Sequence, residues 1–424
     1  MSEDQRRGDG ALTERPLRAY LRDDERLVHV LTNQEVGLER TDGDGETRIR
    51  PAPDCGAVAG LTDRRVLFAV GDHSGDFASG VRYTDIADAE ARTETLTARL
   101  TIETAAGTTW SFSAREADVG PVDAFLTMAC EGWAAVDALE THCERLAEFL
   151  ETGEWDAFER RRERAVETLE DGLDSEASER IPAVGDRIER LAGELYELVR
   201  DRHVLAGQEA LAAAETRLES ESFAASRERV RAARERFQHA VRVAAGRDIQ
   251  TGPAATGLAR AEKLTGAVVG RPWALARERA AAARTRSDPA ERIEGLEEAF
   301  DAYRTLARLV TGEGPAFSGD RASVRDESQA VIEALIDARL ECARERRMAA
   351  NWEWEAGDER AAYEQFTAAR DDLDRALELA SSYPPGDAAA VRERRESLTD
   401  QFDPLVIRFE LAEVDAEAEA DAEE

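Results

Sequence analysis

The residues best able to do chemistry in this chain are five histidines and four cysteines, and their spacing argues against a catalytic or metal site. The histidines are His29, His73, His142, His203 and His239, and none forms a ligand spacing such as H-E-x-x-H. The cysteines are Cys55, Cys130, Cys143 and Cys342, with no C-x-x-C pair to indicate zinc binding or a disulfide framework. His142 and Cys143 are adjacent, but neighbours on a helix point about 100° apart and cannot form a dyad.

Phosphate and carboxylate chemistry are equally poorly supported. The only lysine, Lys263, lies outside any G-x-x-x-x-G-K-[ST] loop. Carboxylate pairs occur throughout, but in so acidic a chain they carry almost no information. We therefore expect no enzyme activity, no cofactor and no bound metal.

The charge balance is strongly acidic. The 424 residues include 90 acidic and 56 basic side chains, giving a net charge of −34, and all but one of the basic residues are arginine. This composition is typical of proteins from halophilic archaea, whose self-repulsion is screened in molar salt, where the Debye length is about 3 Å. The negative charge then reflects habitat and not an acidic functional surface.

The sequence carries no targeting signal that we can identify. Residues 1–15 are polar and lack the apolar core of a signal peptide. No run approaches the roughly 18 apolar residues that would span a bilayer. We expect a cytoplasmic protein, with a membrane-peripheral location as the alternative.

Two arginine clusters raise the question of nucleic-acid binding. One comprises Arg160, Arg161, Arg162 and Arg164, and the other comprises Arg344, Arg346 and Arg347. Both are interleaved with glutamate, which predicts i,i+4 ion pairs on a solvated helix face. Because phosphate contacts also weaken steeply with salt, nucleic acid is an unlikely partner.

The first 130 residues carry the β-type patterning. Residues 95–104 alternate, with Leu96, Ala98, Leu100 and Ile102 on one face, and this period of two predicts a half-buried strand. Ala106-Gly107 predicts a tight turn, and residues 108–113 return with Trp110 and Phe112 inward. Further strands are expected at residues 26–31, 66–70 and 80–86, with breaks at 41–45 and 51–54. Apolar residues from Val119 to Ala129 then follow helical spacing.

Strands closed by one amphipathic helix are the element order of a pleckstrin-homology-like (PH-like) domain. The stretch Gly60-Leu61-Thr62-Asp63-Arg64-Arg65-Val66-Leu67-Phe68 resembles the G-x-L-T-N-K-R-hydrophobic motif of bacterial and archaeal PH-like domains of the YokE-like group. Tyr83-Thr84-Asp85-Ile86 resembles their next strand, a tyrosine–x–x–isoleucine pattern. Asp63 replaces the usual asparagine, which a turn tolerates. The resemblance covers about a quarter of the chain and implies an antiparallel β-barrel or sandwich capped by a helix.

A PH-like domain implies binding to lipid or to protein. A phosphoinositide site needs a basic loop, but residues 40–50 combine Arg40, Arg48 and Arg50 with Asp42, Asp44 and Glu46. Attraction to anionic lipid would be poor, and weaker still in salt. PH-like folds also bind peptides along a sheet edge or helix groove, so a protein partner is favoured over the membrane surface.

Residues from about 114 to 402 are rich in Ala, Glu, Arg and Leu with helical spacing. Four turn signals precede similar helical faces and place starts at 155, 223, 289 and 359. Each start is followed by alanine ten residues later and by a large apolar residue fourteen later, a combination suited to close helix packing. The steps of 68, 66 and 70 residues are about twice the 34-residue tetratricopeptide period. The alternative is a set of unrelated antiparallel helices.

Other features of this zone are a long helix and a weak section. Apolar residues from Ile188 to Leu211 follow near-heptad spacing and predict one helix over about 183–218, packed in a bundle more readily than as an extended coiled coil. Residues 246–272 contain Gly-Pro and Gly-Arg-Pro breaks and predict a hinge between two helical halves. Residues 410–424 contain eight acids and no base.

The sequence thus predicts an α+β multidomain protein. We expect a disordered N-terminus (1–15), a PH-like domain with its capping helix (16–131), helical hairpins in two halves (132–250 and 251–403, with a tetratricopeptide-like unit at 348–381) and an acidic tail (404–424). The expected function is a non-enzymatic intracellular scaffold with two protein-binding surfaces, and the alternative is a peripheral membrane protein. The candidate partner-binding residues are Arg64 and Arg65, expected to be exposed, and the aromatic residues Trp352, Trp354, Tyr363 and Phe366; core packing is the alternative role of these aromatics. The sequence leaves the oligomeric state and the identity of the partner open.

Overall fold

The computed structural model describes residues 12, 16–93, 97–115, 119–311, 317–383 and 386–421, with side chains up to residue 409 except that of Arg115. The chain divides into two compact units: a first unit of Met1–Leu205 with Gln238–Ala254, and a second of Ala206–Phe237 with Ala255–Glu424. Apart from Leu12, the N-terminus that was expected to be disordered lies outside the described residues.

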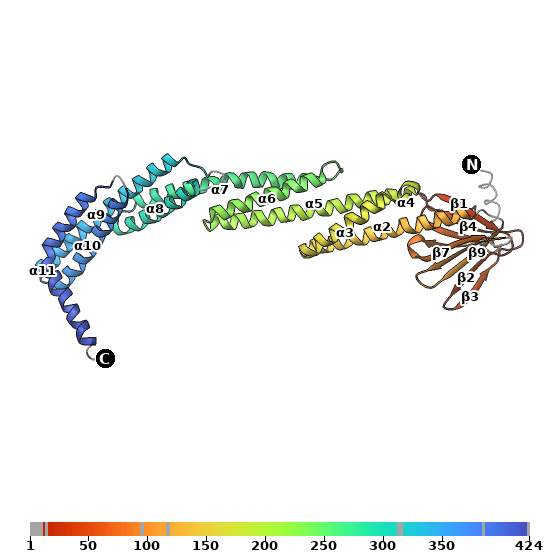
Figure 1. Ribbon diagram of the computed structural model, residues 1–424, viewed down its shortest axis with the longest axis horizontal. Coiled ribbons are helices and arrows are strands. Elements are labelled where there is room, and N and C mark those ends of the chain that lie inside the picture. Colours follow the sequence, from red (N-terminus) through yellow and green to blue (C-terminus); the bar gives the residue numbers. More distant parts are fainter. Residues whose placement is uncertain are drawn as a thin grey trace. The chain divides into compact units, whose positions relative to one another are not determined.

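The first unit opens with a β domain of two antiparallel sheets (Figure 1). The strands are β1 (Leu27–Asn33), β2 (Leu38–Asp42), β3 (Gly45–Ile49), β4 (Ala57–Thr62), β5 (Arg65–Val70), β6 (Phe77–Arg82), β7 (Ile86–Thr93), β8 (Thr97–Thr104) and β9 (Thr109–Arg115). One sheet has the order β1-β4-β5-β6 and the other β3-β2-β9-β8-β7. No pairing among the described residues closes the sheets into a barrel, so the domain is a sandwich.

The hairpin β8–β9 confirms the predicted alternation. Ala98, Leu100 and Ile102 are buried, while Arg99 and Glu103 on the opposite face are exposed. The turn at Gly107 adopts a φ of 78°, which glycine reaches without steric cost. Trp110 and Phe112 return into the core as expected, where Phe68 of β5 stacks on Trp110. The predicted Thr95 and Leu96 lie outside the described residues.

The central strands β4 and β5 are buried on both faces. One face joins the sandwich core, and the other packs under the short 3-10 helix η1 (Leu17–Tyr20), whose Leu17 is 2% exposed. A strand buried on both faces reads as a continuous apolar run instead of an alternating one. The run of large apolar residues made β5 recognisable as a strand in the sequence. The strand β4 was not recognised, because most of its residues are small.

The strand predicted over residues 80–86 is wrong in its second half. β6 ends at Arg82, and Tyr83–Asp85 form the 3-10 turn η2 before β7 begins. Tyr83 is 2% exposed, and its hydroxyl donates to the Thr62 carbonyl at 2.7 Å. Anchoring of this buried tyrosine bends the chain between the two sheets.

The helices are long. They are α2 (Gly120–Thr152), α3 (Trp155–Leu173), α4 (Glu176–Arg180), α5 (Pro182–Glu219), α6 (Phe223–Ala244), α7 (Gly252–Arg284), α8 (Pro289–Thr311), α9 (Arg321–Ala356), α10 (Glu359–Ser382) and α11 (Ala388–Asp421). The α+β class with a helical array is therefore confirmed. No helix among the described residues combines the length and apolar content that crossing a membrane requires.

Helix α2 closes the β domain and extends well beyond it. Its first turns bury Val122, Phe125 and Leu126 against the sandwich, as the sequence predicted. The Asp123 carboxylate accepts the Ala91 N–H of the edge strand β7 at 2.9 Å. The boundary expected between residues 131 and 132 falls inside this helix, because Val136, Leu139 and Leu146 continue its buried stripe against the following helices.

The four predicted turn signals are helix starts. Residues 155, 223, 289 and 359 begin α3, α6, α8 and α10, each directly after a longer helix. The residues ten and fourteen positions later are all at most 5% exposed: Ala165 and Leu169, Ala233 and Phe237, Ala299 and Tyr303, Ala369 and Leu373. The repeated small–large pair therefore marks the packed face of each second helix.

The step between starts corresponds to one long helix followed by one shorter helix, and not to two 34-residue units. The tetratricopeptide-like unit expected at 348–381 begins inside α9, a 36-residue helix, and continues into α10, which has 24 residues. These helices are much longer than a 34-residue helix pair allows. The expected unit is therefore wrong in its length and its start.

The long helix predicted over 183–218 is confirmed as α5. The arginine that interrupts its apolar stripe, Arg202, lies over the Trp155 ring, with the guanidinium carbon 4.0 Å from the ring centroid. The break predicted at 270–272 is wrong, because α7 runs through Pro272. The indole of the next residue, Trp273, donates to Glu327 at 2.8 Å, and this tertiary contact helps to hold the helix across the proline.

Candidate partner-binding surfaces

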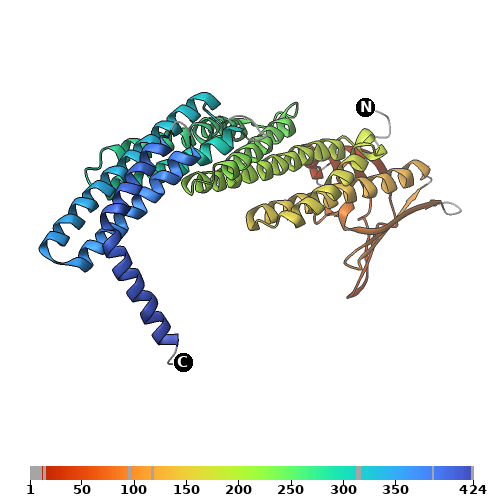
Figure 2. The ribbon, with the colours of Figure 1, turned by 60° about the vertical axis from the view of Figure 1, so that its left-hand side comes forward.

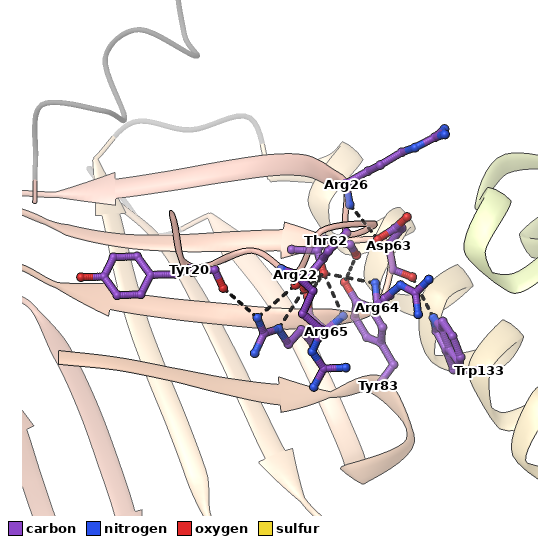
Figure 3. Close-up of polar contacts among 10 residues, drawn as sticks. Tyr20, Arg22, Arg26, Thr62, Asp63, Arg64, Arg65, Tyr83 and Trp133 are labelled. Atoms are coloured by element: carbon purple, nitrogen blue, oxygen red, sulfur yellow. Dashed lines mark hydrogen bonds and ion pairs between the residues drawn. The ribbon is translucent and has the colours of Figure 1, made fainter. Parts of the chain in front are cut away.

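The β4–β5 turn that carries Arg64 and Arg65 (Figure 3) is organised by hydrogen bonds of Thr62, whose hydroxyl also contacts Glu25. The Thr62 hydroxyl accepts the Arg65 N–H at 2.9 Å and lies 2.8 Å from Glu25 Oε1. Thr62 and Glu25 are both buried. A hydroxyl that satisfies the turn's own backbone explains why threonine precedes the Asp-Arg-Arg sequence.

Arg65 holds Glu25 in a bidentate ion pair. Its Nε lies 2.8 Å from Oε1 and its Nη2 lies 3.0 Å from Oε2, while Nη2 also donates to the Tyr20 carbonyl at 2.9 Å. Burial would raise the pKa of Glu25, but the hydrogen bonds from Arg65, the Arg22 backbone and Thr62 together lower it. Gly80 on β6 leaves room for this side chain, since an added Cβ would lie 2.9 Å from Arg65 Nη1.

Asp63 connects the same turn to two other elements. Its carboxylate accepts the Arg26 N–H at 3.0 Å, and its carbonyl accepts the Trp133 indole N–H of α2 at 2.9 Å (Figure 3). Burial raises the pKa of Asp63 against the lowering effects of the Arg26 hydrogen bond and the Arg64 charge. The turn thus joins β1, the β4–β5 hairpin and the capping helix.

The expectation that both turn arginines are exposed is wrong, because both side chains are partly buried. Its side chain is 18% exposed and faces the fully buried Glu25 carboxylate, whereas Arg64 is 28% exposed and pairs with Asp24 at 2.5 Å. Both guanidinium groups already have carboxylate partners within the domain. Their contact with a binding partner stays a prediction, and the geometry assigns Arg65 a structural role.

The four aromatic candidates separate by burial. Phe366 is 0% exposed and packs on Phe402, so it has the core-packing role that was the alternative to partner binding. Trp354 is half-buried against Phe402, and Tyr363 stacks on Phe409 with ring centroids 5.0 Å apart. Trp352 is 67% exposed. Of the four, Trp352 alone presents most of its surface to solvent.

An apolar patch on α9 includes Trp352. Met348, one turn earlier, is 53% exposed. Residues four apart on a helix lie on one face, so the two side chains are neighbours. We call Met348 and Trp352 the α9 patch. Exposed large apolar side chains are ordinary when scattered, but a tryptophan with an apolar neighbour is typical of interaction surfaces.

The sequence predicted ion pairs between the α9 arginines and glutamates of the same helix. The ion pairs that the structure shows for Arg339 and Arg346 are with residues of other helices. Arg339 and Arg346 reach across to the buried Asp372 of α10, at 3.0 and 2.7 Å. Arg344 and Arg347 are exposed. Arg344, Arg346 and Arg347 were recognised as a sequence cluster, but only helix packing separates the structural arginine from the two that remain available.

A pocket of about 520 Å³ lies beside these two arginines, between α9, α10 and α11. The three helices run alongside one another in both ribbon views (Figure 1, Figure 2). Leu340, Ala343, Leu373 and Leu398 supply its apolar floor, and Arg394 of α11 lies at its edge with Arg344 and Arg347. Neither Arg394 nor this pocket was predicted, because the floor is assembled from three helices.

Among the histidines and cysteines, His203 of α5 and His239 of α6 come together, with ring centroids 4.1 Å apart. Burial raises the pKa values of Cys130, Cys143 and Cys342 to about 11, so these thiols stay protonated and poorly nucleophilic at neutral pH. The neighbours His142 and Cys143 face different partners, Arg161 and the Leu191 carbonyl. Within the described part of the chain, no group of three or more His, Cys, Asp and Glu side chains could hold a metal ion.

Comparisons with known proteins give faint likenesses. No family model and no curated protein matches the chain. A solved structure described as the Vps36 N-terminal PH domain is 20% identical and covers 28% of this chain and 89% of its own, with a TM-score of 0.21. A circular tandem repeat protein with novel repeat topology and enhanced subunit contact surfaces is 12% identical and covers 68% of this chain and 73% of its own, with a TM-score of 0.17. At such scores, the description of the chain as a β sandwich capped by a helix and followed by a helical array rests on its own strand order and helix packing.

Proposed function

We propose that this chain is a non-enzymatic protein-binding scaffold, with one binding surface on the helical array and a second on the β domain. The observation that carries the proposal is the exposure of Trp352, at 67%, beside Met348 on α9. Burying an indole on a partner removes a large apolar surface from water, and tryptophan is among the side chains that dominate binding energy.

The β domain would supply the second surface. Val28 on the edge strand β1 is 47% exposed, and Val36 just beyond that strand is 39% exposed. An edge strand offers unpaired backbone groups, and apolar side chains beside it favour pairing with an extended segment of a partner. We therefore propose protein recognition at β1 in preference to Arg64 and Arg65.

Docking on anionic lipid is less well supported. The segment expected to be a headgroup-binding loop is the β2–β3 hairpin, in which Arg40 pairs with Asp42 at 2.9 Å and Arg48 pairs with Glu39. A headgroup would have to displace these carboxylates. The net charge of −34 opposes binding to a negative surface as well.

Site-specific photo-crosslinking tests the proposal in the full-length chain. A photoreactive amino acid would replace Trp352 in one variant and Val28 in another, with Leu173, also an exposed apolar residue at 43%, as the matched control position. We expect discrete protein adducts from positions 352 and 28 and none from position 173. Adducts of equal yield at all three positions, or lipid adducts at position 28, would contradict the proposal.

A further inference from the structure

The pocket between α9, α10 and α11 combines an apolar floor with a cationic rim. Leu373 and Leu398 are buried at 5% and 2% exposure, and the exposed residues Arg344, Arg347 and Arg394 flank them. A volume of about 520 Å³ admits several side chains of a bound segment. Leu340 is half-buried and exposes part of the floor, whereas Leu373 and Leu398 lie at its base.

The rim arginines have no partner within the described part of the chain. No hydrogen bond or ion pair there involves Arg344, Arg347 or Arg394. Their neighbours Arg339 and Arg346, on the same helix, are neutralised by Asp372. Arg344, Arg347 and Arg394 are therefore free to bind an anionic group, whereas Arg339 and Arg346 have a structural role.

Local charge at the pocket is opposite in sign to that of the chain. Two carboxylates also line it, but Glu341 is engaged by Arg292 of α8. Asp337 is the remaining carboxylate among the lining residues, against the three arginines Arg344, Arg347 and Arg394. The rim is therefore net positive in a protein whose net charge is −34.

The shape of a guanidinium group points to the chemistry of the occupant. Its planar fork matches a carboxylate bidentately, and such charge-assisted hydrogen bonds are shorter and stronger than neutral ones. Long polyanions such as nucleic acid and anionic membranes would meet the acidic surface around the pocket. A short segment with two or three carboxylates around one apolar side chain would match both rim and floor.

We propose that this pocket binds an acidic segment of a partner protein, with an apolar side chain on the leucine floor and carboxylates on Arg344, Arg347 and Arg394. The α9 patch continues the same surface, because Arg344, Met348 and Trp352 succeed one another at intervals of four on α9. The inference rests on the proposed scaffold function and names the chemistry of its partner.

Selection from a displayed library of short random peptides tests the inference. Full-length wild type and the triple variant Arg344→Gln, Arg347→Gln and Arg394→Gln would be selected in parallel. Arg392→Gln, an exposed α11 residue outside the pocket, is the matched control. Circular dichroism of each variant confirms folding, which we expect because all the substituted residues are exposed.

We expect the wild type and Arg392→Gln to enrich peptides with Asp or Glu beside a large apolar residue. The triple variant should lose this enrichment, and its affinity for the enriched peptides should fall at least about tenfold. Absence of acidic enrichment with the wild type, or equal enrichment with the triple variant, would overturn the inference. Selective binding of a peptide of residues 410–424 in place of library peptides would also overturn it, because the acidic end of this chain, from the same or another copy, would then be the occupant.

The two proposals fail separately. If binding of acidic peptides does not depend on the rim arginines while position 352 still crosslinks a protein, the proposed scaffold function is supported and the inference of an acidic partner is wrong. If acidic peptides bind through the rim but position 352 gives no adduct, the α9 patch is not part of a partner surface.

Discussion

The Trp133 indole nitrogen donates to the Asp63 carbonyl oxygen at 2.9 Å, which joins helix α2 to a turn 70 residues earlier in the chain. The same turn bonds to Arg26, the residue before β1, through the Asp63 carboxylate and to η2 through the Thr62 carbonyl. The motif that resembles PH-like domains is thus a junction of four elements. Folding contacts account for Thr62, Asp63 and Arg65, and contact of the motif with a binding partner stays a prediction.

Trp133→Phe should weaken the junction while preserving most of the packing. Loss of the indole donor leaves the Asp63 carbonyl, on a residue 3% exposed, without this hydrogen bond, at a cost of about 1–2 kcal/mol. Hydrogen exchange of peptides covering residues 57–70 measures this local stability. Trp352→Phe is the control and should leave these peptides unchanged; equal protection in both variants would contradict the assignment.

Glu25 and Arg65 should be strongly coupled. Removing either partner leaves an uncompensated charge beside a buried site and should cost about 2–4 kcal/mol, whereas replacing both by leucine should cost less than the sum. A double-mutant cycle on the same exchange-protected peptides gives the coupling free energy. Additive single effects would mean that the pair contributes no mutual stabilisation.

Glu327 should make the free energy of unfolding of the second unit depend on pH in the acid range. Its carboxylate accepts hydrogen bonds from Arg277, Trp273 and Tyr303, which hold its pKa at about 2, below the ordinary 4.5. The stabilisation is complete above pH 4.5 and is lost as pH falls toward 2, with a magnitude on the order of 1 kcal/mol after solvent screening. Urea unfolding of wild type and Glu327→Gln at several pH values should give curves that converge as pH falls. A stability difference independent of pH would exclude this contribution.

The small residues of the helix pairs should not tolerate enlargement. Ala299, at 0% exposure, occupies the position of α8 that its counterparts occupy in α3, α6 and α10. Ala299→Leu should destabilise the array by about 1–3 kcal/mol through overpacking. Ala349→Leu, at an exposed position of α9, should be nearly neutral in the same denaturation experiment.

Local patterns in the sequence predicted most of the elements. Period-two alternation located β8 and β9, and turn signals located the starts of α3, α6, α8 and α10, because these features depend on residues close together in the chain. The break predicted at Pro272 is wrong because the helix is held by a contact between Trp273 and a residue 54 positions away. The strand predicted at Tyr83 is wrong because the tyrosine hydroxyl bonds to the Thr62 carbonyl on another strand.

The candidate site was far less predictable than the fold. Arg65 looked exposed because its partner, Glu25, lies 40 residues earlier in a segment with no recognisable pattern. Arg344 and Arg346 are indistinguishable by spacing, and only the position of Asp372 on α10 separates them. The pocket floor draws on α9, α10 and α11, so no single stretch of sequence could reveal it.

The contact between Asp123 and the Ala91 N–H has a consequence for self-association. β7 is an edge strand, and an open edge is a template for pairing with another chain. Helix α2 packs against β7, and the Asp123 carboxylate occupies one of its backbone donors. Growth of this sheet into an intermolecular β-aggregate is therefore obstructed along β7 by the helix that completes the domain.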